Sequence, residues 1–345
     1  MPKSNGPKFS VTDTPRFCDP DAAREFLEAK RWPDGPVCPH CGVEGEAYRL
    51  QPDPTLKSQR HARKGLWKCA ACRKQFTVTI GTIFEDSKIP LHKWLHAIHM
   101  LCSSKKGISA HQLHRNLGVT YKSAWFMAHR IRWSMTQEPL SSKLDGIVEI
   151  DETYVGGKRR VSNWPSNMSE EKKKRILGEN PQPWDSKVGV APHAGKQIVM
   201  SLVQRGGKVR SMHIERVTAE TLRPVLDEYL ADGAHVMTDS AAALKKSSKD
   251  TWKHDRVNHA AKEYVRYENG VVISTNTVEG YFATLKRGIN GVYHHVGKQH
   301  LHRYLSEFDF RYNAREVNDV DRAELALKGT EGKRLFYRDS SVPKA

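Results

Sequence analysis

The chain has 345 residues, of which 38% are hydrophobic and 28% charged, and its formal net charge is +17 at pH 7. No apolar run approaches the roughly 18 residues that a membrane span requires, and the N-terminus shows no apolar export signal, so we expect a cytoplasmic protein without a membrane segment. The length allows two or three domains. The large basic excess predicts a polyanionic partner, most simply DNA.

Residues 1–36 form an N-terminal segment in which the range 13–32 predicts a short helix. Asp19 or Asp21 is suited to cap it, because a short acidic side chain accepts hydrogen bonds from the first helical N–H groups. Phe26, Leu27 and Trp32 are expected to be buried.

Two Cys-x-x-Cys pairs lie within residues 37–85, namely Cys38 with Cys41 and Cys69 with Cys72. This spacing is typical of a zinc ribbon, in which two hairpin turns each present two thiolates to one Zn²⁺ ion. The alternative, a redox motif, needs one such pair in a βαβ context, which is absent from this sequence. We therefore predict a structural zinc site that stabilises a segment with few large apolar residues.

Residues 86–138 carry three predicted helices, after a β-branched stretch at 75–84 that we interpret as a strand. The first helix covers residues 89–102. The second begins near Ser109 and ends at Gly118, and the third begins after Thr120, a favourable N-cap. A helix, a short glycine-containing turn and a second helix form a helix-turn-helix layout, although a plain helical hairpin has the same pattern.

The third helix of this group is predicted to contact DNA, because it is basic and aromatic in a basic part of the chain. We expect it to expose its polar and aromatic side chains in varying degree, Arg132 included. The predicted DNA-contacting residues are Tyr121, Lys122, Trp125, His129 and Arg130.

The segment Val148–Gly157, "VEIDETYVGG", is the centre of the second half of the chain. Val148 and Ile150 alternate with Glu149 and Asp151, a pattern that predicts a short strand with apolar side chains on one face. The paired glycines end it, so that Asp151 is placed at or near the end of the strand. Taken alone, such an aspartate either completes the turn or serves as a metal ligand.

The segments that follow predict a β-β-β-α-β order. A polar insertion at 158–187 separates the first strand from two strands at 197–204 and 209–217, which are joined at Gly206-Gly207. A helix capped by Thr218 leads to a short strand at 235–240 that contains Asp239. The first and fourth strands thus each deliver an aspartate.

A third acid lies in a helix predicted at 274–289, with Asn276 as its N-cap. Glu279 lies beside the apolar stripe of this helix, and Lys286 follows two turns later on the same face. In isolation, Glu279 also suits the closing position of a helix cap, and Lys286 and Arg287 also suit an ordinary solvated surface. Residues 300–315 form an aromatic helix that we assign to the core, and 316–345 read as a charged, weakly patterned tail.

Two aspartates on neighbouring strands and a glutamate from a crossing helix are sufficient to hold two Mg²⁺ ions. Such a pair of ions, about 3.5–4 Å apart, activates the attacking oxygen and stabilises the leaving oxygen in phosphodiester chemistry. Lys286 would then hold a DNA phosphate near the ions.

The order of these motifs strongly resembles that of bacterial insertion-sequence transposases with an ISXO-like DDE domain. The resemblance covers most of the chain, from about Cys38 to Arg315. Its motifs are the two cysteine pairs, the helix-turn-helix, "IDETYVGG", "TDS", "STNTVEGYFATLKRGINGVYHHV" and "HLHRYLSEFDFRYNAR".

The resemblance implies an α/β fold, with a ribonuclease-H-like catalytic domain at 146–315 preceded by the zinc ribbon and the helix-turn-helix domain. It also implies that Asp151, Asp239 and Glu279 are the catalytic acids that bind Mg²⁺. Asn276 is the alternative for the third position, and Lys286 matches the basic residue of the family.

The activity implied is cleavage of the 3′ ends of an insertion sequence, followed by joining of those ends to target DNA. The implied partners are double-stranded DNA, namely terminal inverted repeats and target, and further copies of the chain, at least a dimer on DNA, in association with the nucleoid. Lys286 and Arg287 are expected to contact DNA. The alternatives are a DNA-binding regulator with an inert second domain, and a ribonuclease-H-like nuclease that cuts without joining.

Overall fold

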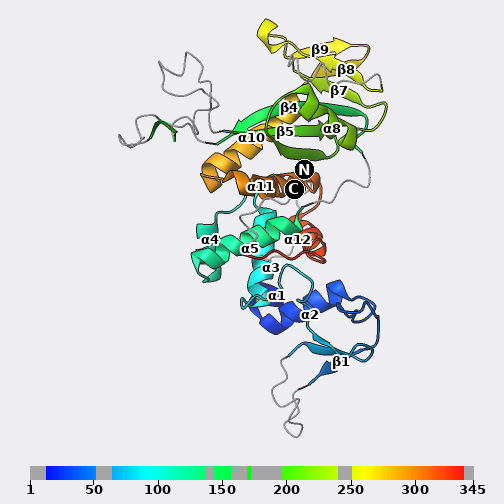
Figure 1. Cartoon of the computed structure of the whole chain (residues 1–345), viewed down its shortest axis with the longest axis vertical. Coiled ribbons are helices and arrows are strands. Elements are labelled where there is room, and N and C mark those ends of the chain that lie inside the picture. Colours follow the sequence, from blue (N-terminus) through cyan, green and yellow to red (C-terminus); the bar gives the residue numbers. More distant parts are fainter. Residues whose placement is uncertain are drawn as a thin grey trace, which may run out of the picture. The chain divides into compact units, whose positions relative to one another are not determined.

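The computed structural model describes residues 13–51, 64–136, 143–156, 169–171, 196–239 and 251–337. The chain divides into two compact units (Figure 1). The first unit is Met1–Gln137 together with Ala314–Ala345, and the second is Glu138–Asn313. No helix within the described ranges is long and apolar enough to cross a membrane. The predicted insertion at 158–187 lies outside the described residues, apart from 169–171.

The first unit begins with two helices and a small sheet. Helices α1 (Pro15–Cys18) and α2 (Pro20–Arg31) precede strands β1 (Ala47–Leu50), β2 (Leu66–Cys69) and β3 (Gln75–Phe76), which pair antiparallel in the order β1-β2-β3. Asp19 caps α2, accepting from the N–H groups of Asp21 and Ala22. The carboxylate of Glu28 accepts from Arg49 at 2.6 Å and from the Trp67 indole at 3.3 Å, and so ties α2 to the sheet.

The strand predicted at 75–84 is wrong beyond its first two residues. After β3 the backbone forms turns. Thr82 and Ile83 do not pair with a neighbouring strand. Instead, Thr82 makes an isolated bridge to Glu331, and Ile83 N–H donates to Thr330 O. The apolar side chains of this stretch are nevertheless buried, Ile83 and Phe84 among them.

The remaining helices of the first unit are α3 (Leu91–Ser103), α4 (Ala110–Leu117), α5 (Tyr121–Ser134) and α12 (Asp319–Lys328). The predicted layout of α4 and α5 is confirmed. Ser109 caps α4, Gly118 ends it in the left-handed region at φ 59°, and the Thr120 side chain accepts from Ser123 N–H to cap α5. The turn is tight because glycine adopts this φ without a steric penalty.

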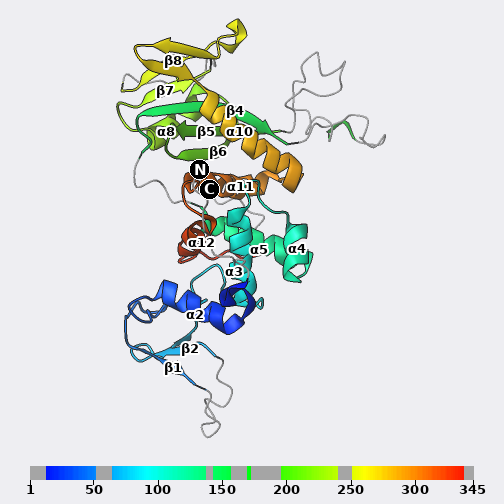
Figure 2. The same cartoon turned by 180° about the vertical axis from the view of Figure 1, so that it is seen from behind.

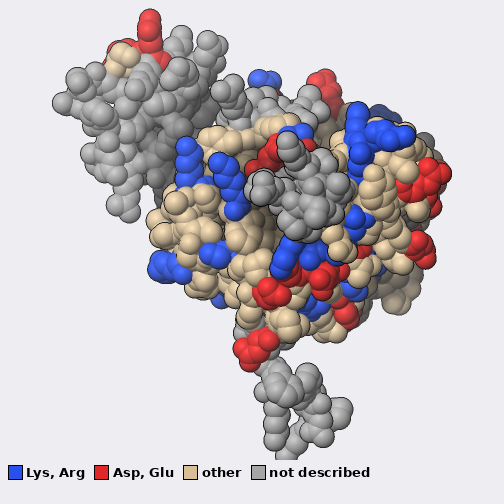
Figure 3. Space-filling model, turned by 90° about the horizontal axis from the view of Figure 1, so that it is seen from below, with Lys and Arg blue, Asp and Glu red and all other residues tan. Residues whose placement is uncertain are grey.

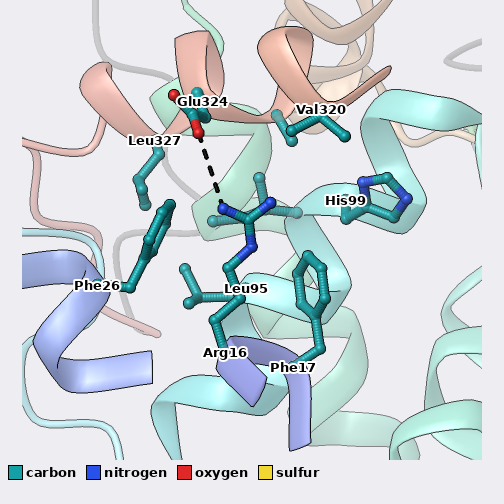
Figure 4. A pocket seen from close by; sticks show the side chains of 10 residues that line it. Arg16, Phe17, Phe26, Leu95, His99, Val320, Glu324 and Leu327 are labelled. Atoms are coloured by element: carbon teal, nitrogen blue, oxygen red, sulfur yellow. Dashed lines mark ion pairs between the residues drawn. The ribbon is translucent and has the colours of Figure 1, made fainter. Parts of the chain in front are cut away.

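The description of residues 316–345 as a weakly patterned tail is wrong for its first part, which contains α12. Arg322 on this helix donates to the carbonyl oxygen of Cys102 at the end of α3. Figure 4 shows a small pocket at the contact of α12 with the N-terminal helices, in which the Arg16 guanidinium lies over the Phe26 ring, 4.5 Å from its centroid, and 3.7 Å from Glu324. The two ends of the chain thus build one unit.

The second unit contains a five-stranded mixed sheet in the order β6-β5-β4-β7-β8. Strands β4, β5 and β6 pair antiparallel, whereas β4, β7 and β8 run parallel. The predicted glycine hairpin between β5 and β6 is confirmed. The strands are β4 (Ile147–Val155), β5 (Gln197–Gln204), β6 (Val209–Ile214), β7 (His235–Thr238) and β8 (Lys253–Arg256).

Helices cover both faces of this sheet (Figures 1 and 2). Helix α8 (Ala219–Tyr229) packs on the face that carries Val148 and Ile150, whereas α10 (Asn276–Gly288) and α11 (Leu301–Asn313) pack on the face that carries Val155 and Val199. Side chains of β4 therefore pack alternately into two separate cores, one on each face of the sheet. On α11, Phe308 lies in the second core and Tyr312 packs against it, and Tyr304 is also buried, so that this helix belongs to the interior as predicted.

The link from β8 to α10 contains a hairpin that the sequence pattern did not predict. Strands β9 (Val265–Glu268) and β10 (Val271–Ser274) pair antiparallel, and β10 leads directly into α10. Short single-turn elements complete the unit: η3 (His259–Ala261), η4 (Ile289–Tyr293) and η5 (Lys298–His300).

Candidate active site and metal centre

The four predicted zinc ligands meet in the first unit. The Sγ atoms of Cys38, Cys41, Cys69 and Cys72 all lie within 4.8 Å of one another. Two Sγ pairs, Cys38 with Cys72 and Cys41 with Cys69, are 3.7 Å apart. A tetrahedral Zn²⁺ with Zn–S bonds of about 2.3 Å requires sulfur atoms about 3.8 Å apart, so this cluster fits a structural zinc ion.

The two cysteine turns have the same backbone pattern, which explains why they converge. Cys38 N–H donates to Val43 O and Cys69 N–H to Lys74 O, five residues on in each turn. Each turn then passes through a left-handed residue, Gly42 at φ 76° and Arg73 at φ 63°. Glycine takes this conformation freely, whereas arginine takes it at a cost that the ribbon fold must offset.

The backbone of the first turn also prepares its thiol for a metal. Burial raises the pKa of Cys38, but hydrogen bonds from the backbone N–H groups of His40 and Cys41, together with those from the thiols of Cys41 and Cys72, lower the pKa to about 7. A thiolate is the form that binds zinc.

In the second unit, Asp151 and Asp239 occupy matching positions on neighbouring parallel strands. The pairing of β4 with β7 ends with Ile150 opposite Thr238. Asp151 is the next residue on β4, and Asp239 is the residue immediately after the end of β7. In-register parallel neighbours place their side chains on the same face of the sheet. Asp151 was predicted near the end of its strand, but β4 continues to Val155 because its antiparallel partner β5 extends that far.

Glu279 lies in the first turns of α10, on the same face of the sheet. Its Oε1 accepts from the Thr275 hydroxyl at 3.1 Å and is 3.8 Å from Nε2 of His259. The side chain is 48% exposed. The three carboxylates form a looser group than the cysteines. Among the described residues, the four cysteines are the one such group whose ligand atoms all lie within 4.8 Å of one another.

Asp151 is a buried carboxyl among other acids. Burial raises its pKa to about 7, the hydrogen bond from Glu152 N–H opposes the rise, and the charges of Asp239, Glu152 and Glu279 add to it. Removal from water and nearby like charges both disfavour a second or third negative charge. The site therefore favours a cation or a proton.

Asn276 is not the N-cap of α10, contrary to the prediction. The N-cap is Thr275, whose side chain makes no capping hydrogen bond, and Asn276 is the exposed first residue of the helix. The first helical N–H groups are bonded instead by Glu149 from β4, at 2.7 Å to Thr277 N and 3.0 Å to Val278 N. Glu149 is fully buried. In the sequence, Glu149 alternates with Val148 and Ile150. This pattern placed Glu149 on the polar face of the strand but did not predict its hydrogen bonds to α10.

The two basic residues predicted on α10 are both exposed. Lys286 and Arg287 lie in the last turn, two turns after Glu279, on a helix whose buried stripe contains Phe282 and Leu285. They are thus available to a ligand at the surface.

On α5 the predicted DNA-contacting residues separate into two groups. Tyr121 and Lys122 are exposed in the first turn, and Trp125 is half-buried. The predicted exposure of His129, Arg130 and Arg132 is wrong, since the three side chains are 0%, 5% and 2% exposed.

Arg130 shows why the second half of α5 is internal. Its guanidinium donates to Glu85 O at 2.6 Å and lies over the rings of Trp94 and Phe126. Burial, together with the neighbouring charge of Arg334, lowers its pKa to about 10. The residue supports the helical core of the first unit.

The positive charge is spread over the surface shown in Figure 3. On that face, Lys and Arg form several separate groups, with Asp and Glu groups between them. The described Lys and Arg residues therefore do not form one continuous basic area on this face.

Together, the four-cysteine ribbon and the mixed α/β unit define a zinc-ribbon protein with a separate α/β domain. Residues 143–313 match the family model of the ISXO2-like transposase domain, and residues 19–75 match that of the transposase zinc-ribbon domain. The chain belongs to the insertion-sequence transposases that combine these two domains, which confirms the resemblance noted from the sequence.

A similar protein is known from an archaeal mobile element. Over 304 residues the chain is 28% identical to an uncharacterized protein in transposable element ISH50 of Halobacterium salinarum. The match covers 86% of this chain and 91% of that protein, so the two are alike over nearly their whole lengths.

Proposed function

We propose that this protein binds the terminal repeats of an insertion sequence, cleaves the 3′ ends and joins them to target DNA. The observation that carries the proposal is the placement of Asp151 and Asp239 directly after the last parallel pair of β4 and β7, together with Glu279 at the start of a helix packed on the same face of the sheet. We assign the domain to the ribonuclease-H-like class, supported by its mixed sheet in the order β6-β5-β4-β7-β8 with helices on both faces.

The donor set suits Mg²⁺, a hard ion that prefers carboxylate oxygens and retains several waters. Asp151, Asp239 and Glu279 would hold it, and the raised pKa of Asp151 supports this assignment because a bound cation offsets the crowding of negative charge. When bound, two such ions activate the attacking oxygen and stabilise charge on the leaving oxygen. Glu279 is preferred to Asn276 as the third ligand, since its charge acts on Asp151.

The protein's own residues then position the DNA. Lys286 and Arg287, exposed on α10 beyond Glu279, suit binding of phosphates of the strand to be cut. Contacts of this kind fix the position of the backbone without reading its sequence.

We assign recognition of the element ends to the first unit. The tight turn between α4 and α5 supports a helix-turn-helix, a motif in which the start of the second helix contacts base edges. Tyr121 and Lys122 are exposed at that start, so they are the residues proposed to contact DNA, with Trp125 beside them. Two element ends must be held together, so the active form is an oligomer of at least two copies.

The experiment that tests this function uses a labelled duplex carrying the element end, together with a supercoiled target plasmid, in Mg²⁺ or in EDTA. Joined product in Mg²⁺ that is absent in EDTA and in Glu279→Gln, but present in Asn276→Ala, is the expected result. Cut strands without joined product would instead indicate a nuclease. Tight binding without cutting in any divalent metal would indicate a regulator.

A further inference from the structure

Glu149 lies two residues before Asp151 on β4, on the same face of the sheet, with no exposed surface. A carboxylate so deeply buried requires compensation, because removal of a charge from water is costly unless it is paired and hydrogen-bonded. Its four hydrogen-bond donors come from two places that are distant in the sequence.

The first group of donors belongs to the start of α10. Oε2 accepts from the backbone N–H groups of Thr277 at 2.7 Å and Val278 at 3.0 Å, and Oε1 accepts from the Thr277 hydroxyl at 2.9 Å. Glu149 therefore caps the helix from another element, where the positive end of the helix dipole stabilises a negative charge. The N-cap residue Thr275 makes no such bond with its own side chain.

The second donor is Arg205, whose Nε is 2.6 Å from Oε1 of Glu149. The same guanidinium donates to Val272 O at 2.5 Å, and to Ser274 O at 3.1 Å and Ser274 Oγ at 2.8 Å. Arg205 thus neutralises Glu149 and also fixes the end of β10, from which α10 begins. Both sides of the junction between β10 and α10 are held against β4.

A direct metal-binding role for Glu149 does not agree with this arrangement. Both oxygens are occupied by donors, and the residue opposite Glu149 on β7 is Met237, whereas Asp239 stands at the level of Asp151. The contacts of Glu149 are instead with the helix that carries Glu279, at the two residues immediately before it, Thr277 and Val278.

We propose that Glu149, paired with Arg205, is a positioning residue that holds the first turn of α10 against β4 and thereby sets the place of Glu279 relative to Asp151. The inference rests on the proposed function, because it assigns a role within that catalytic site. An outer residue of this kind orients metal ligands without touching the metal, and its loss typically costs about 10- to 100-fold in metal affinity or activity.

The first test is Glu149→Gln in the full-length protein. The amide retains the shape but replaces one acceptor oxygen with an NH₂ group. In one orientation this group faces the N–H groups of Thr277 and Val278, and in the other it faces the Nε–H of Arg205. We expect end binding to remain, the dissociation constant for Mn²⁺ measured by electron paramagnetic resonance to rise about 10- to 100-fold, and cleavage to need correspondingly more metal. The matched control is Glu307→Gln, which alters another fully buried carboxylate of this unit, bonded to Tyr293 and Arg311.

A second pair of variants tests the positioning role of Glu149 even if Glu149→Gln does not fold. Thr277→Val removes one donor to Glu149 from a half-buried site, and Thr277→Ser keeps the hydroxyl. We expect Thr277→Val to weaken Mn²⁺ binding about 2- to 10-fold and Thr277→Ser to restore it, a difference that a general loss of packing would not produce.

The outcomes separate the two proposals. Wild-type protein that binds no Mn²⁺ and cuts no DNA would overturn the proposed function itself. Wild-type protein that binds Mn²⁺ and cuts, with Thr277→Val and any folded Glu149→Gln showing unchanged metal dependence, would overturn the positioning role alone.

Discussion

Asp151 and Asp239 are the first residues beyond the last parallel pair of β4 and β7, so they stand side by side at one level of the sheet. At this level β7 ends, whereas β4 continues along β5. Asp239 therefore follows the end of β7, whereas Asp151 lies within β4, and α10 carries Glu279 on the same face of the sheet. The candidate site is thus made by a difference in length between two neighbouring strands.

Asp151→Asn is expected to abolish cleavage and leave binding to the element end intact. The amide occupies the same place but lacks the charge that a hard cation requires. Binding to a labelled end is measured by mobility shift and cleavage on a denaturing gel. The control is Asp232→Asn, which changes an exposed aspartate of the same unit and is expected to cut like wild type. Cleavage retained in Asp151→Asn would show that another acid has this role.

Without Mg²⁺ at the acidic site, the stability of the protein is expected to depend on pH through Asp151. Because burial raises its native pKa to about 7, above the ordinary 3.8, the native state retains a proton that the unfolded chain has released between these values. Stability from this group is therefore present at low pH and is lost as the pH rises through about 7.

The variant that removes this titration provides the measurement. With zinc retained and no Mg²⁺ added, Asp151→Asn should be more stable than wild type to urea at about pH 8, by no more than about 4 kcal/mol, with a smaller difference at about pH 5. A difference of equal size at both pH values would contradict the assigned pKa. Asp232→Asn again serves as the control.

Two basic residues of α5 are expected to respond in opposite ways. Lys122→Ala should weaken end binding, reduce the slope of log affinity against log salt by about 1, and change stability by less than about 0.5 kcal/mol. Arg130→Ala should lower stability by about 1–3 kcal/mol, since it removes the bond to Glu85 O and the packing on Trp94. Fluorescence anisotropy at several salt concentrations and urea unfolding distinguish them. Equal stability losses would contradict the surface role of Lys122.

Local signals in the sequence were sufficient for several elements. Ser109, Gly118 and Thr120 define the ends of α4 and α5 because caps and left-handed glycine positions depend on a few adjacent residues. The cysteine spacing was sufficient for the metal cluster for the same reason. The two aspartates were singled out because each closely follows apolar strand residues, and their catalytic role stays a prediction.

Features that depend on distant partners were not predicted. The sequence "KHDR" of β8 is polar, and it forms a strand because it pairs with β7 at the edge of the sheet. Glu149 is buried because Arg205 and the start of α10 meet it in three dimensions. The inward position of Arg130 similarly follows from α3 packing against α5, which periodicity within α5 alone did not reveal.

Zinc removal is expected to unfold the ribbon and weaken end binding. The sheet β1-β2-β3 is small, and the cysteine cluster joins its two turns, so loss of the ion removes a binding free energy on the order of 10 kcal/mol. Chelation, or Cys38→Ser combined with Cys41→Ser, should reduce the bound zinc and change the far-UV circular dichroism. Cys18→Ser, which alters an exposed cysteine outside the cluster, should change neither. Unchanged circular dichroism and unchanged end binding after complete loss of zinc would mean that the ribbon is stabilised by its protein contacts alone, chiefly those of Glu28 with Arg49 and Trp67.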